Sequence, residues 1–145
     1  MRARLILTAM ILAACGGDGD GGLTGGDSDL SGAWTVLGSA QSTSGIPATC
    51  TISGDLFLNQ SGNTASGTFD GSTRCENPDL GSITDNVDGP VAGIQVDGDN
   101  VSWSKDGCEL DGEFDGDDRV EGDLTCTTEY LGIPVTIEGT WQLSR

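Results

Sequence analysis

The stretch CTISGDLFLNQSGNTASGTFDGSTRC, residues 50–75, decides the fold, because it reads as one long hairpin with a cysteine at each open end. Its fold point is the pair Gly62 and Asn63, since both residue types adopt the positive φ values that a two-residue hairpin turn requires. Folding there places Cys50 opposite Cys75 and keeps the apolar side chains on one face. The stretch therefore predicts a pair of long antiparallel strands.

The stretch CELDGEFDGDDRVEGDLTC, residues 108–126, repeats this layout. Folding about Asp117 places Phe114 opposite Val120, and the end cysteines again face each other. From the turn outward, both hairpins have the order aromatic, glycine, aliphatic, cysteine. We therefore predict a second hairpin of the same kind.

The cysteines of these hairpins allow three connectivities, and they could also remain free core residues. Directly opposed residues of antiparallel strands have Cβ atoms about 4.5 Å apart, which is within disulfide reach. We therefore predict the disulfides Cys50–Cys75 and Cys108–Cys126.

The N-terminus reads MRARLILTAMILAAC, with a basic start, an apolar run and small residues before Cys15. This order is typical of a secretory signal, and the run is shorter than the ~20 apolar residues of a membrane helix. Residues 12–15, Leu-Ala-Ala-Cys, resemble the bacterial lipobox. The resemblance implies cleavage before Cys15 and lipidation, including palmitate, at Cys15, so that the membrane is a partner through this anchor. Gly16, where an aspartate would retain a lipoprotein at the inner membrane, favours the outer membrane of the cell envelope.

Lipidation of Cys15 leaves an even number of cysteines, and export to an oxidising compartment allows them to pair. We expect a signal peptide at 1–14 and a lipidated, flexible Gly/Asp-rich tether at 15–29, because that composition cannot bury enough apolar surface to fold. Residues 30–145 are then one domain.

The charge of the chain excludes one class of partner. After the signal peptide, four basic residues stand against twenty-three acidic ones, a net charge near −19. A nucleic-acid groove requires a basic stripe, so we expect no nucleic acid partner. The acidity is explained by solubility, and we expect a monomer.

Period-two apolar runs separated by Gly, Asp, Asn and Pro recur along the domain and predict strands. We predict eight of them, at 32–38, 49–60, 63–75, 90–97, 100–105, 108–115, 119–127 and 134–144. The fold class is all-β, an eight-stranded antiparallel up-and-down β-barrel. A shared G-x-W-x-aliphatic pattern at residues 32–36 and 139–143 indicates that the first and last strands pair and close it.

The Gly32-x-Trp34 pattern on the first strand resembles the lipocalins, and the size of the domain resembles the shorter avidin-like barrels. The resemblance implies a calycin-like barrel with Trp34 plugging its closed end. The biotin-contacting residues of avidins have no match here, so that ligand does not carry over.

Tight turns share one end of this barrel and longer connections share the other, where all four domain cysteines lie. We expect the disulfides to brace a mouth between the loops 38–48 and 76–88, facing away from the tether. The candidate binding residues form an apolar lip and one inward indole. They are Ile46, Tyr130, Leu131, Ile133 and Trp103. A packing role for each is the alternative.

The alternation also predicts which side chains point inward: Trp34, Val36, Ile52, Leu56, Leu58, Phe69, Ile94, Val96, Val101, Trp103, Leu110, Phe114, Leu124, Ile137 and Trp141. Opposed inward glycines, Gly54 with Gly71 and Gly112 with Gly122, leave room for a ligand or mark bends of a tightly curled sheet. Because they are paired, we expect bends and a largely filled core.

Histidine is absent from the sequence, so serine or cysteine nucleophiles lack their usual base, and zinc sites that use histidine are excluded. We expect no enzymatic activity and no cofactor. Carboxylates face each other on the outward side, and weak Ca²⁺ binding would relieve their repulsion. These candidate metal ligands are Asp111, Glu113, Glu121 and Asp123.

The sequence thus predicts a non-enzymatic, lipid-anchored barrel that binds a small apolar ligand or a partner at its disulfide-braced loop end. The alternative is a filled barrel that acts through its loops as a structural, interaction or protease-inhibitor-like protein.

Overall fold

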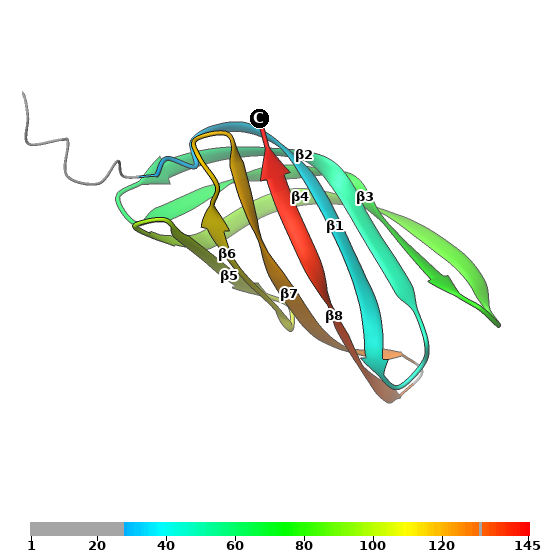
Figure 1. The fold of residues 1–145 in the computed structure, drawn as a ribbon. Coiled ribbons are helices and arrows are strands. Elements are labelled where there is room, and N and C mark those ends of the chain that lie inside the picture. The colour runs from blue at the N-terminus through cyan, green and yellow to red at the C-terminus, as the bar shows by residue number, and fades with distance from the viewer. Residues whose placement is uncertain (1–27, 131) are drawn as a thin grey trace, which may run out of the picture.

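The computed structural model of the protein describes residues 28–130 and 132–145. Eight antiparallel strands form the fold (Figure 1). They are β1 (Gly32–Ser44), β2 (Thr49–Ser61), β3 (Thr64–Asn77), β4 (Gly81–Asp97), β5 (Asn100–Lys105), β6 (Cys108–Phe114), β7 (Arg119–Tyr130) and β8 (Ile133–Ser144). Within these residues no helix is long and apolar enough to cross a membrane. The predicted signal peptide and Cys15 lie outside the described residues.

The strands follow each other in sequence order around a closed barrel, which confirms the predicted up-and-down topology. β1 pairs with β8, with Val36 opposite Leu143, so the repeated G-x-W pattern does mark the closing pair of strands. In Figure 1 the red β8 lies beside the cyan β1.

Both cysteine-ended hairpins have the predicted register. Cys50 lies opposite Cys75 and Cys108 opposite Cys126, and each pair is joined by a disulfide. The Cα atoms of the pairs are 4.0 and 3.9 Å apart, the close spacing of non-hydrogen-bonded sites in an antiparallel ladder. Facing cysteines at such sites lie within disulfide reach.

The opposed glycine pairs lie where facing strands approach too closely for a side chain, so they do not leave room for a ligand. A Cβ at Gly54 or Gly71 would overlap the backbone of the facing strand, and the Phe69 ring lies over both residues. A Cβ at Gly122 would likewise overlap the backbone of β6, while the indole of Trp141 lies over Gly112. An aromatic ring thus covers each place where the sheet curls too tightly for a side chain.

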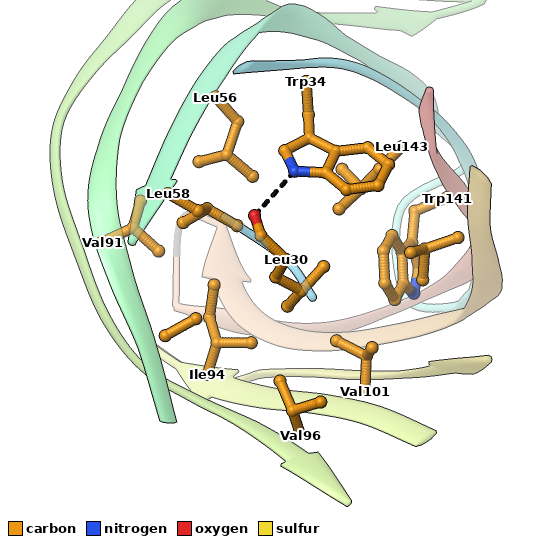
Figure 2. Close-up of a cluster of buried hydrophobic side chains, with 12 residues drawn as sticks. Leu30, Trp34, Leu56, Leu58, Val91, Ile94, Val96, Val101, Trp141 and Leu143 are labelled. Carbon is orange, nitrogen blue, oxygen red and sulfur yellow. Dashed lines mark hydrogen bonds between the residues drawn. The ribbon is translucent and has the colours of Figure 1, made fainter. Parts of the chain in front are cut away.

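The closed end is plugged by two residues. Leu30 and Trp34 are 0% and 2% exposed, and Trp34 Nε1–H donates to the Leu30 carbonyl oxygen at 2.8 Å. Figure 2 shows Leu30 surrounded by apolar side chains from several strands. Phe114 meets Trp34 edge to face with ring centroids 6.4 Å apart, and the Arg145 guanidinium lies 4.3 Å above the indole. The predicted role of Trp34 as the plug is confirmed.

The predicted loops at the other end are mostly strand. β1 continues to Ser44, and β4 begins at Gly81 where a loop had been expected up to residue 88. These extensions project beyond the barrel core, and every residue from Gly81 to Asp88 is exposed. With water on both faces, backbone pairing continues without the apolar alternation that identified the other strands.

The barrel wall is uneven between β4 and β5. These strands pair only from Gln95 to Asp97, whereas β4 pairs with β3 over almost its whole length. Beyond that contact the indole of Trp103 spans the gap, and its Nε1–H donates to the Ala92 carbonyl oxygen at 3.0 Å. In Figure 1 the β3–β4 hairpin diverges from the β5–β6 hairpin. The wall is therefore open along the first part of β4.

Candidate ligand-binding cavity

The half of the barrel away from Trp34 contains a cavity of about 490 Å³. Its size falls within the range of ~300–1,000 Å³ that is usual for small-molecule sites. The apolar side chains that line it come from all eight strands. They include Val36, Ile52, Leu56, Phe69, Val91, Val101, Trp103, Leu110, Leu124, Ile137 and Trp141.

The expectation of a largely filled core is therefore wrong for this half of the barrel. Every side chain predicted to point inward does belong to the core or to the cavity wall. The cavity remains because the residues that face it near its open end are small. Gly38, Ala40 and Thr73 line it together with the disulfides, and side chains of this size do not reach the centre of the barrel.

The disulfides lie in the wall of the cavity and do not hold loop tips. All four cysteines line it, with Cys50–Cys75 on the β2–β3 side and Cys108–Cys126 on the β6–β7 side. Since β2–β3 and β6–β7 are separated by two strands in each direction around the barrel, the disulfides stiffen opposite walls. The predicted bracing of the open half is present, but the β3–β4 hairpin extends beyond it.

Trp103 is the predicted binding residue that the structure places in the cavity wall. Its N–H is bonded to Ala92, and the N–H of Trp141, the other indole of the wall, donates to the Asp123 carbonyl oxygen at 2.9 Å. Both indoles therefore have their donors satisfied by backbone and offer only apolar ring surface to a ligand. The charged residues of the wall are Asp88, Lys105 and Asp106.

The predicted apolar lip is not part of the cavity. Ile46 lies half-buried in the β1–β2 turn and Ile133 is 45% exposed at the start of β8, and neither lines the cavity. Their loops are neighbours, because a Cβ at Gly45 would lie against the Pro134 carbonyl oxygen. Leu131 and the side chain of Tyr130 lie outside the described part of the chain.

The outward carboxylates have the predicted register, with Asp111 opposite Asp123 and Glu113 opposite Glu121. Glu121 is also bonded to Arg119, with Nη2 and Oε2 2.6 Å apart. Among the described residues, no three or more histidine, cysteine, aspartate or glutamate side chains are grouped to hold a metal ion. Calcium binding by these carboxylates stays a prediction.

A second hollow of about 600 Å³ lies between the β1–β2 and β3–β4 turns. Its walls carry Gln41, Ser42, Thr49, Glu76, Asn77 and Ser82 together with prolines and small residues. It is more open to solvent and more polar than the barrel cavity, which is why we take the barrel cavity as the candidate site.

The fold and the cavity together define an eight-stranded up-and-down β-barrel with an apolar interior site. No known family model and no curated protein matches the chain. Among solved structures, the S-type phycobiliprotein lyase CPES from Guillardia theta is similar, with a TM-score of 0.47 and 11% sequence identity over 80% of this chain and 88% of that one.

Proposed function

We propose that the protein is a non-enzymatic lipoprotein of the cell envelope whose barrel binds a small apolar ligand. The observation that carries the proposal is the cavity of about 490 Å³ with its apolar wall. An unfilled apolar space of this size forfeits packing contacts that a ligand would restore. The wall contains no histidine, because the chain has none, which supports binding over catalysis.

The proposal of a membrane anchor rests on the sequence alone, and the first described residues indicate the end of the barrel at which a tether would join. Ser28 donates to the Asp99 carboxylate at the β4–β5 turn, at 2.6 Å, and Leu30 plugs the same end of the barrel. A tether from a lipidated Cys15 would reach the barrel there. The cavity, at the opposite end, would then face away from the lipid.

Binding is tested with the chain from Cys15 onward, carrying Cys15→Ser to prevent lipidation, and with the neutral fluorescent probe N-phenyl-1-naphthylamine. We expect saturable enhancement of probe fluorescence. Thr73→Phe, which adds a ring inside the cavity, should abolish it. The matched control is Thr68→Phe, on the outward, exposed face of the same strand, which should bind as the parent does.

Two results would contradict the binding proposal. One is a probe that does not bind at all, and the other is equal loss of binding in the control variant. Native mass spectrometry of the protein from its own host then shows whether a small molecule co-purifies.

Anchoring is tested separately by mass analysis of the mature N-terminus. We expect an acylated Cys15 in the membrane fraction and a soluble protein for Cys15→Ser. An unmodified N-terminus on a membrane-bound protein would refute the anchor and leave the binding proposal intact.

A further inference from the structure

β4 has a long free edge. Its residues from Gly81 to Ile94 pair with β3, but on the other side β4 meets β5 only from Gln95 onward. The strand is therefore paired on one side alone for most of its length. Unpaired backbone groups along such an edge are a template for one more strand.

The ladder identifies which backbone groups face the open side. Because Cys50 and Cys75 form a non-hydrogen-bonded pair, the backbone groups of Cys75 turn away from β2 and toward β4, where Cys75 lies opposite Ile83. Ile83 therefore faces β3, and its neighbours face outward. The open edge presents the N–H and C=O groups of Ser82, Thr84, Asn86 and Asp88.

Two other residues confirm this alternation. Pro90 continues the set of residues whose backbone groups face the open side of β4. Its missing N–H therefore removes no bond to β3. Ala92 follows in that set, and its carbonyl oxygen accepts the Trp103 indole N–H from across the gap. The Trp103 side chain thus bonds to a backbone group that a neighbouring strand would otherwise bond.

Apolar surface is exposed beside this edge. Six large hydrophobic side chains are exposed in the described residues, and three of them, Leu80, Ile83 and Val87, lie within one hairpin. Ile83 and Val87 share the inward face of β4 and are 54% and 40% exposed, and Val87 also lines the cavity. A strand added along β4 would cover both side chains with its own apolar residues.

The charges of the hairpin indicate what kind of strand fits. Its single basic residue, Arg74, is bonded to Glu76, with Nη2 and Oε1 2.7 Å apart. On the outward face Asp70 lies opposite Asp88, and both carboxylates are exposed and make no ion pair in the described structure. A basic segment would neutralise them, whereas a second copy of the chain would bring the same charges and be repelled.

We propose that the free edge of β4 binds an extended basic segment of a partner protein, in which apolar residues alternate with lysine or arginine. Its backbone bonds to Ser82, Thr84 and Asn86, and its apolar side chains cover Ile83 and Val87 on the inward face. Its cations lie on the outward face, on the side of Asp70 and Asp88. The proposal does not rest on a ligand in the cavity, although Val87 belongs to both sites.

The test uses the Cys15→Ser mature chain and a nine-residue synthetic peptide in which lysine and valine alternate. Amide hydrogen exchange is followed by NMR. At saturating peptide we expect the amides of Ser82, Thr84 and Asn86 to exchange about tenfold more slowly, while those of Ile83 and Val87, already bonded to β3, stay unchanged. A peptide of the same composition with its lysines in one block is the control and should give no protection.

Variants make the proposal falsifiable. Asn86→Pro removes an edge donor without removing a bond to β3 and should weaken peptide binding about tenfold, whereas Asn86→Ala should not. If Asn86→Pro disturbs the fold, Asp70→Lys with Asp88→Lys serves instead, because both carboxylates are on the outward face, and it should reject the lysine peptide and accept a glutamate–valine peptide.

Three outcomes would overturn the proposal. They are no protection of the edge amides, equal binding to the Asn86→Pro or charge-reversed protein, and concentration-dependent self-association that protects the same amides. Because N-phenyl-1-naphthylamine binding is read in parallel, failure at the edge and failure in the cavity remain distinguishable.

Discussion

The closed and open halves of the barrel are built from the same strands but differ in what fills them. The closed half holds Leu30, Trp34 and Leu58, each at most 3% exposed, while the open half surrounds an apolar cavity. The walls of the two halves are also secured differently, by close packing in one and by disulfides in the other. The difference shows how a small barrel can contain a cavity. The packed core of the closed half stabilises the fold, and the disulfides hold the strands around the cavity in the open half.

The largest effect is expected from the plug. Trp34→Ala should destabilise the protein by about 3–5 kcal/mol, because it removes a fully buried ring from a packed site. Trp103→Ala is the matched change in the open half and should cost clearly less, because its ring already borders empty space. Urea unfolding measures both free energies. Equal losses would mean that the two halves are equally packed.

Removing one disulfide should have the next largest effect. Replacing Cys108 and Cys126 together by serine should cost roughly 3 kcal/mol, as expected for a closed loop of this length. Thermal unfolding of the variant, with and without reductant, gives the value. We also expect weaker N-phenyl-1-naphthylamine binding, because the cavity wall loses its brace. Unchanged stability would show that strand pairing alone holds the open half.

Replacing one leucine in each half by a larger side chain tests the same difference in packing by adding volume instead of removing it. Leu58→Phe should destabilise by about 1–3 kcal/mol because the closed half has no spare volume. Leu124→Phe, which projects into the cavity, should change the free energy of unfolding by less than about 0.5 kcal/mol. Chemical unfolding of both variants measures these two changes in the free energy of unfolding. A large loss at Leu124 would contradict the presence of the cavity.

The smallest expected effect concerns pH at the closed end. The Ser31 backbone N–H and then its hydroxyl bond to Asp29, and these bonds, with the nearby Arg145, lower the pKa of Asp29 below its ordinary value of 3.8 against a small opposing effect of burial. A lowered pKa in the folded state gives stability that is present above the ordinary value and is lost as pH falls through the lowered one. Asp29→Asn should therefore be slightly less stable at neutral pH, and the difference should vanish in acid. Unfolding curves between about pH 6 and pH 2 test this, and a difference that persists in acid would contradict it.

The hairpin registers and barrel closure could be predicted from the sequence because each rests on local pairing. Cys50 with Cys75 and the paired glycines mark positions that only one register satisfies. The first half of β4 was missed because Gly81 to Asp88 face water on both sides and carry no alternation. The cavity was missed because the volume left by Gly38, Ala40 and Thr73 depends on the barrel's diameter, which no local pattern encodes. Ile46 and Ile133 do not line the cavity, and the apolar lip stays a prediction.

The contacts of Arg145 bear on the order in which the protein folds. Its guanidinium donates to the carbonyl oxygens of Ser31 and Asp117 and covers Trp34, so three distant parts of the chain meet at one side chain. β1 likewise needs β8 along its second edge. Each hairpin forms from neighbouring residues, but closure of the barrel requires β8, the last strand of the chain, to pair with the first. Until β8 pairs, β1 has an unpaired edge and Trp34 lacks the Arg145 side chain that covers it, so the unclosed barrel is the species most exposed to aggregation.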